Sequence, residues 1–157
     1  MELRPVTAQN WRELIKLKVS DEQAHLVASN LYSIAEAQFG FEDEGHWDLY
    51  PFGAYVGDEP VGFVMYCYNF DYSRFQAFII RLMVDEHFQG KGYGREIMQL
   101  VLNDFRENQN IKNVGISYEP ENAVAQKLYA SLGFIEPGEM MDGEIGQSHL
   151  NCRRQEL

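Results

Sequence analysis

One glycine-rich hexapeptide restricts the fold of this chain more than any other feature of the sequence. It reads Gln-Gly-Lys-Gly-Tyr-Gly over residues 89–94. Residues 75–84, shortly before it, form an almost unbroken apolar run, which predicts a buried strand. Residues 93–108 carry apolar side chains at helical spacing, which predicts an amphipathic helix. The hexapeptide is therefore expected to turn the chain from a buried strand into a helix, as in folds that cover a sheet with helices.

The composition of the hexapeptide is typical of a phosphate-binding loop. Its glycines permit positive φ angles and let backbone N–H groups converge with no Cβ in the way. The N-terminus of the following helix adds a partial positive charge, and Lys91 and Arg95 can add charge-assisted contacts. The hexapeptide matches neither the dinucleotide-binding fingerprint nor the NTPase P-loop. A turn with a purely structural role is the alternative interpretation.

A second motif follows the next expected strand. It reads Asn-Ala-Val-Ala-Gln-Lys-Leu-Tyr-Ala-Ser-Leu-Gly-Phe over residues 122–134. Asn122 is a favoured helix cap, and Gly133 is expected to end the helix in the left-handed conformation. Five apolar or aromatic side chains are predicted to face inward, namely Val124, Ala125, Leu128, Tyr129 and Leu132. Taken alone, this is an ordinary capped helix.

Helix and turn signals divide the rest of the chain. Asn10 with Glu13, and Ser20 with Gln23, have the spacing of capping pairs, and each pair precedes a helical apolar pattern. We expect a polar, partly aromatic loop over residues 39–51. The expected strands cover residues 2–6, 52–56, 61–68, 75–84, 112–118, 134–141 and 144–150, the last two joined across Asp142-Gly143.

Composition narrows the class of protein. No linker divides the 157 residues, so we expect one domain over 1–157. The net charge of -11 argues against nucleic acids and anionic membranes as partners. The two cysteines have no metal-ligand spacing, so no metal is expected. No apolar stretch approaches the ~18 residues of a membrane span, and no signal region is present, so we expect a cytoplasmic protein.

In this order, the two motifs resemble those of the GNAT superfamily of N-acetyltransferases, Gln/Arg-x-x-Gly-x-Gly/Ala and Asn-x-x-Ala-x-x-x-Tyr-x-x-x-Gly-Phe. The resemblance is strongest over residues 63–134. It implies an α/β (α+β) fold with a mixed, mostly antiparallel sheet of about seven strands flanked by helices. It also implies direct acetyl transfer from acetyl-CoA to an amine in a ternary complex, and a homodimer is expected of the family.

The resemblance assigns roles to individual residues. Tyr129 would be the acid that protonates the departing thiolate. Backbone groups at the strand end would bind the pantetheine arm, loop amides would hold the pyrophosphate, and the second motif would complete the coenzyme A site. The residues implied are Leu82, Met83 and Val84 at the strand end; Gln89, Gly90, Lys91, Gly92, Tyr93, Gly94 and Arg95 in the loop; and Asn122 and Ala125 in the second motif.

The general base is a separate prediction. Several polyamine enzymes of the family place a carboxylate where this chain has Ile80 and Arg81, so that assignment does not transfer. Glu119, just after the strand predicted at 112–118, is the best candidate, acting directly or through water. A solvated turn carboxylate at that position, with backbone carbonyls and water serving as the base, is the alternative.

The acceptor is predicted from weaker signals. Short strings resemble bacterial diamine or spermidine/spermine N-acetyltransferases, and an acidic protein suits a small cationic amine. The candidate acceptor residues are Glu22, Tyr32, Glu36 and Arg81, with further acids at Glu42, Asp43 and Glu44. The acids can instead be ordinary exposed side chains. Other acceptors, such as an amino acid, an aminoglycoside or a protein N-terminus, and a non-catalytic acyl-CoA-binding module are the alternatives.

Overall fold

The computed structural model of the chain describes residues 1–40, 47–135, 140–141 and 144–151. Within these ranges one sheet runs in the order β1-β2-β3-β4-β5-β7-β6. Every neighbouring pair is antiparallel except β4 and β5, which are parallel. The expected mixed, mostly antiparallel sheet is confirmed. The strands are β1 (Glu2–Pro5), β2 (Asp48–Val56), β3 (Glu59–Tyr68), β4 (Ala77–Val84), β5 (Asn113–Tyr118), β6 (Met140–Met141) and β7 (Glu144–Asn151).

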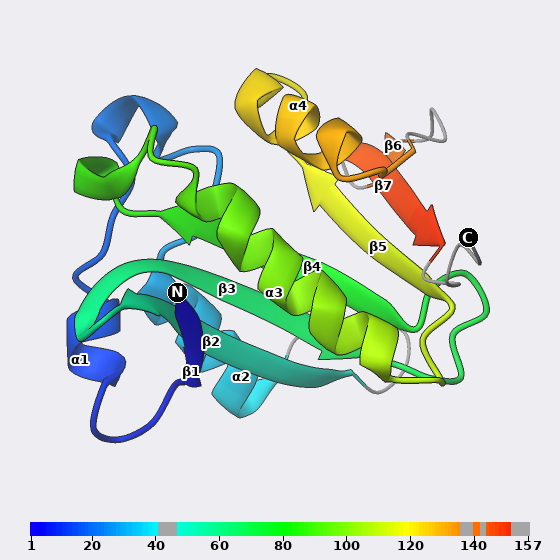
Figure 1. Cartoon of the computed structure of the whole chain (residues 1–157), viewed down its shortest axis with the longest axis horizontal. Helices are drawn as coiled ribbons and strands as arrows, with labels where there is room; N and C mark the ends of the chain where they lie inside the picture. Colours follow the sequence, from blue (N-terminus) through cyan, green and yellow to red (C-terminus); the bar gives the residue numbers. More distant parts are fainter. Residues whose placement is uncertain (41–46, 136–139, 142–143, 152–157) are drawn as a thin grey trace.

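Helices cover both faces of this sheet (Figure 1). One face packs against the apolar side of α3, formed by Ile97, Met98, Val101, Leu102 and Phe105. The other face, around Phe63 and Met65, packs against the N-terminal helical segment. The helices are α1 (Trp11–Leu14), η1 (Asp21–Gln23), α2 (Asn30–Phe39), η2 (Glu86–Phe88), α3 (Tyr93–Glu107) and α4 (Ala123–Ser131). Within the described ranges, no helix is long and apolar enough to cross a membrane.

The N-terminal helical segment is more broken than the sequence pattern predicts. The side chain of Ser20 caps no helix, and η1 is a single 3-10 turn. The effective N-cap is Ser29, whose Oγ accepts a hydrogen bond from the backbone N–H of Tyr32 over 3.2 Å. The side chain of Asn10 likewise caps no helix, because its Oδ1 accepts from the backbone N–H of Thr7 and its Nδ2 donates to the carbonyl of Pro5. The helix start predicted from Ser20 and Gln23 is therefore wrong, since α2 begins at Asn30.

Two further boundaries differ from expectation. β2 begins at Asp48, inside the loop expected over 39–51, because its first residues pair with β3 as far as Tyr68. The strand expected over 134–141 is limited to Met140–Met141 among the described residues, and the turn Asp142-Gly143 lies outside them. On α4, Val124 is 75% exposed rather than inward.

β4 and β5 diverge, and this divergence creates the cleft of the molecule. The two strands pair only where Ala77–Ile79 meets Val114–Ile116. Immediately afterwards Ile80 forms a bulge, because Met65 pairs with Arg81 while Tyr66 pairs with Ile79. Figure 1 shows the two strands separating toward their carboxyl ends, with α3 in front of the sheet and α4 beside the end of β5. Such a point in a parallel pair is a usual location for a ligand.

Candidate active site

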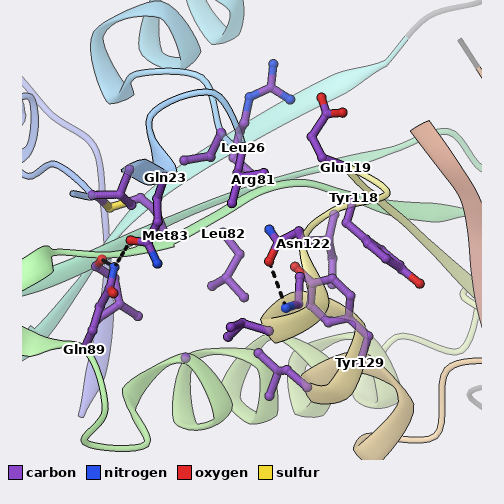
Figure 2. Close-up of a pocket in the computed structure, with 18 of the residues that line it drawn as sticks. Gln23, Leu26, Arg81, Leu82, Met83, Gln89, Tyr118, Glu119, Asn122 and Tyr129 are labelled. Atoms are coloured by element: carbon purple, nitrogen blue, oxygen red, sulfur yellow. Dashed lines mark hydrogen bonds between the residues drawn. The ribbon is translucent and has the colours of Figure 1, made fainter. Parts of the chain in front are cut away.

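A pocket of about 910 Å³ lies at the carboxyl ends of β4 and β5 (Figure 2). One wall is the N-terminal stretch from Gln23 to Ala28, and the opposite wall is the start of α4. The floor is the end of β4 and the glycine loop. Among the predicted site residues, those that line it are Arg81, Leu82, Met83, Val84, Gln89, Gly90, Gly92, Tyr93, Gly94, Arg95, Glu119, Asn122, Ala125 and Tyr129.

The glycine loop has the geometry of an anion cradle. Gly90 and Gly92 have φ angles of 75° and 86°, and Gly92 is the N-cap of α3. Among the described residues, none accepts a hydrogen bond from the backbone N–H groups between Gly90 and Gly94. A Cβ added at Gly90 or Gly92 would meet no atom within 4 Å, so the loop faces open space. Unpaired donors at a helix N-terminus, open to solvent, fit the pyrophosphate of coenzyme A.

The cations near this loop are not equivalent. Lys91 does not line the pocket; its Nζ donates to the carbonyl of His87 over 3.3 Å and lies 4.9 Å from the ring centre of Phe88. Arg95 does line it, and its guanidinium donates to Ser131 Oγ over 2.7 Å. Lys127 also lines the pocket. Lys127 could not be predicted as a site residue, because it occupies an exposed position of an ordinary amphipathic helix.

Gln89 links three segments around the floor of the pocket. Its side-chain amide donates to the carbonyl of Val84 over 3.0 Å and to Gln23 Oε1 over 2.9 Å. The Val84 carbonyl is therefore occupied by protein. Beyond Ile79, β4 has no strand partner on its β5 side within the described ranges. The edge of residues 81–84 on that side is open to the pocket.

Tyr129 is buried in the wall of the pocket formed by α4. Asn122 caps that helix, its Oδ1 accepting from the backbone N–H of Ala125 over 3.0 Å. The Tyr129 ring packs 5.7 Å from Tyr118 and 6.0 Å from Phe134, and Figure 2 shows it on the same side of the pocket as Asn122. Within the described part of the chain, the Tyr129 hydroxyl has no hydrogen-bond partner. Its oxygen is not among the buried atoms that lack a partner, so it remains accessible although the ring is buried.

The ionisation of Tyr129 follows from this environment. Burial, and secondarily the neighbouring Tyr118, raises the pKa of Tyr129 well above its ordinary value. The phenol is therefore neutral throughout the physiological range. It carries a proton that it can donate to a group placed in the pocket.

The predicted base and acceptor residues are only partly brought together. Glu119 lines the pocket near the end of β5, and no described residue pairs with its carboxylate. Arg81 also lines it, but its guanidinium donates to Glu36 over 3.2 Å. Glu22, Tyr32 and Glu36 do not line it, and Tyr32 is 57% exposed. The acids predicted nearby in the sequence, Glu42, Asp43 and Glu44, lie outside the described residues.

The unpaired amides at the N-terminus of α3 can hold a pyrophosphate, and the open edge of β4 beside them can bind an extended arm attached to it. Residues 11–134 match the sequence model of the acetyltransferase (GNAT) family, and the chain belongs to that family. As a member of it, the protein is an acetyl-CoA-dependent N-acetyltransferase. No group of His, Cys, Asp or Glu side chains within the described ranges could hold a metal ion.

Known proteins similar to this chain act on different acceptors. The chain is 28% identical over 144 residues to the spermine/spermidine N(1)-acetyltransferase of Bacillus subtilis (strain 168), covering 89% of this chain and 91% of that enzyme. The spermidine N-acetyltransferase of Vibrio cholerae, solved with CoA and spermine, has a TM-score of 0.71 at 17% identity, covering 96% and 94%. An aminoglycoside acetyltransferase solved with coenzyme A has a TM-score of 0.73 at 16% identity, covering 95% and 93%. The last two likenesses concern the fold alone.

Proposed function

We propose that this chain acetylates a primary amine of a small polycation such as spermidine or spermine, by direct transfer from acetyl-CoA in a ternary complex. The observation that carries the acceptor is the near full-length similarity to the Bacillus subtilis spermine/spermidine enzyme. The net charge of -11 is consistent with it, since an acidic surface attracts polycations. Within the pocket, Glu119 supplies one carboxylate to an ammonium group.

The cofactor end of the pocket binds and orients the donor. The amides from Gly90 to Gly94 hold the pyrophosphate, with Arg95 and Lys127 nearby. The open edge of β4 at Leu82–Val84 offers backbone groups to the pantetheine arm and one N–H to the developing oxyanion. Acetyl-CoA supplies an activated acyl group as a thioester.

The acceptor end of the pocket holds the two side chains that transfer protons. The attacking amine must be neutral, and Glu119, directly or through water, takes its proton. Tyr129 donates its phenol proton to the departing thiolate, and the proton that Glu119 takes from the amine returns to the phenolate through solvent. No acyl-enzyme is needed, since the amine attacks the thioester while both substrates are bound.

An acceptor screen tests the proposed substrate. Purified protein is incubated with acetyl-CoA and one amine at a time, and released thiol is measured. The panel is spermine, spermidine, a diamine, free amino acids, an aminoglycoside and a peptide with a free N-terminus. We expect kcat/KM to be highest for spermine or spermidine. Turnover of amino acids, aminoglycoside or peptide without turnover of the polyamines would replace the proposed acceptor, and no turnover with CoA binding intact would favour a non-catalytic binding module.

Glu119→Gln tests the proposed base. The amide keeps the size of the side chain but cannot take a proton. We expect the variant to lose kcat at neutral pH and to recover part of it at higher pH, where more of the amine is already neutral. Glu121→Gln, at an exposed residue of the same loop paired with His25 over 3.4 Å, is the matched control. Equal profiles for native protein and Glu119→Gln would assign the proton to water or backbone carbonyls.

The single domain over 1–157 and the homodimer remain predictions. Sedimentation equilibrium measures the oligomeric state directly. The exposed apolar residues of α2, Leu31, Tyr32 and Phe39, are the surface that we would expect to change accessibility on self-association.

A further inference from the structure

The bulge at Ile80 and the loss of pairing between β4 and β5 occur at the same point of the chain. Ile79 is the last residue of β4 that pairs with β5, through Ile116. The next residue, Ile80, is the extra residue of the bulge against β3. A bulge bends its strand and re-aims the residues that follow. The direction in which Leu82–Val84 enter the pocket is therefore decided at Ile80.

The side chain of Arg81 connects this bulge to α2. Its Nη1 donates to the carbonyl of Ile80 over 3.0 Å, and its Nη2 donates to Glu36 Oε2 on α2 over 3.2 Å. The side chains of Arg81 and Glu36 are only 21% and 16% exposed. The planar guanidinium thus joins the bulged backbone to a helix on the far face of the sheet. A lysine ammonium, a point charge without a fork, does not hold two such acceptors in fixed geometry.

We propose that Arg81, held by Glu36, is a positioning residue that fixes the bulge at Ile80 and so sets where the open edge of β4 meets the thioester. Its guanidinium is committed to the protein and does not bind the acceptor. The effect is on the chemical step, because the N–H donors at the strand end must lie where the oxyanion develops. The expected effect on kcat rests on the proposed function. The expected effect on the position of the β4 edge rests on the fold alone.

The pair is a poor source of stability. Among the described residues, the buried Nε of Arg81 has no hydrogen-bond partner, which is an unfavourable arrangement. Replacing a buried ion pair by apolar side chains of similar size is frequently neutral or stabilising. If the pair had only a structural role, its replacement would lower neither the melting temperature nor kcat. If it positions β4, its replacement would lower kcat and leave the melting temperature unchanged. The double variant Arg81→Met with Glu36→Met separates the two roles.

Kinetics with spermidine and acetyl-CoA give the first readout. For the double variant we expect an unchanged or raised melting temperature and a kcat lower by about 10- to 100-fold, as for misplaced oxyanion donors. The dissociation constant for CoA should be little changed, since the amides of the glycine loop remain. Arg81→Lys should fall between native protein and the double variant. A raised KM for spermidine with an unchanged kcat would overturn the proposal, because it would make Arg81 an acceptor ligand.

Amide hydrogen exchange gives the second readout and needs no acceptor. In the CoA complex of Arg81→Lys and of the double variant, the amides of residues 80–84 should exchange faster than in the native complex, while those of α3 do not change. Unaltered exchange at residues 80–84 in both variants would overturn the proposal. If native protein fails to acetylate spermidine, the proposed acceptor is wrong, and the exchange result still decides the role of Arg81.

Discussion

The side-chain amide of Gln89 donates a hydrogen bond to Gln23 Oε1 over 2.9 Å, so the first residue of the glycine loop is tied to the N-terminal wall of the pocket, formed by residues 23–28. A second connection lies beside it, where the buried carboxylate of Asp85 accepts from the backbone N–H of Lys18 over 3.0 Å. Lys18 and Gln23, the two ends of this stretch, are thereby attached to Asp85 and Gln89, which bracket the segment between β4 and the glycine loop. The N-terminal wall and the glycine loop are therefore connected.

Gln23→Ala is expected to weaken CoA binding without altering the glycine loop itself. The wall then has to be ordered when the cofactor binds, and that ordering reduces the net affinity. A hydrogen bond of this kind contributes about 0.5–1.5 kcal/mol, so the dissociation constant should rise about two- to tenfold. Calorimetric titration with CoA measures it. Gln99→Ala, at an exposed position of α3 away from the pocket, should leave the constant unchanged. Equal constants for both variants would contradict the coupling.

Tyr129→Phe removes the proposed donor and nothing that the described structure uses. We expect kcat to fall by about 10²–10⁴-fold, the range for loss of a positioned acid. The melting temperature should change little, because no described residue forms a hydrogen bond with the Tyr129 hydroxyl. Steady-state kinetics and thermal melting measure the two effects.

Tyr55→Phe is the matched control for that substitution. The Tyr55 hydroxyl donates to Glu13 Oε1 over 2.6 Å, and neither residue lines the pocket. This variant should therefore lose stability, by about 1–3 kcal/mol, and keep its kcat. If Tyr129→Phe retained native kcat, the thiolate would have to be protonated by water or by another group.

The parts of the fold that local chemistry dictates were predictable from sequence. The chain turns from β4 into α3 at the glycine loop because only glycine readily adopts the positive φ angles of Gly90 and Gly92. Asn122 caps α4 as expected, and Gly133 ends the following turn with a φ of 92°. These signals act over a few residues, and no distant contact overrides them.

The acceptor side of the pocket was less predictable, because long-range contacts decide it. Glu36 and Arg81 are far apart in the chain, and nothing local indicates that they pair across the sheet. The same holds for Gln23, whose partner Gln89 lies on another element. Ser20 has the spacing of a capping pair with Gln23, yet Ser29 caps α2 although Tyr32, not Glu or Gln, lies three residues later. The capping-pair rule therefore does not decide where this helix begins.

Gly92→Ala should strain the loop and weaken CoA binding together. Gly92 has a φ of 86°, and an added Cβ would meet no atom within 4 Å, so the cost comes from the backbone conformation and not from a clash. An L-residue in that region costs about 1–2 kcal/mol. If the loop relaxes to relieve it, the converging amides separate and the dissociation constant for CoA should rise by about tenfold.

Gly57→Ala separates strain from binding. Gly57 also has a positive φ, 62°, with open space around the missing Cβ, and it lies in the turn between β2 and β3 away from the pocket. We expect a similar loss of melting temperature and an unchanged affinity for CoA. Equal affinities for the two variants would mean that the conformation of Gly92 does not shape the pyrophosphate site.

Stability should fall steeply in alkaline solution because of three buried tyrosines, Tyr55, Tyr66 and Tyr129, and the partly buried Tyr68. Burial raises the pKa of Tyr55 and Tyr68 to about 12, helped by a nearby carboxylate in each case. Burial raises the pKa of Tyr66 and Tyr129 further. Unfolded tyrosines ionise near pH ~10. Above that pH the unfolded state releases protons that the folded state retains. The contribution of these tyrosines to the free energy of unfolding is therefore complete below pH ~10 and declines above it.

Each such tyrosine removes about 1.4 kcal/mol per pH unit between its unfolded and folded pKa values. Titration followed by phenolate absorbance and circular dichroism should show the phenolate signal of this buried set rising together with the loss of secondary structure. Tyr66→Phe removes one of the two groups with the highest pKa and should make the alkaline decline shallower, although it also removes the 3.3 Å hydrogen bond to Asp104. Complete phenolate formation in protein that keeps its native circular dichroism would contradict the burial of these side chains, because a folded core cannot hold four phenolates without solvent.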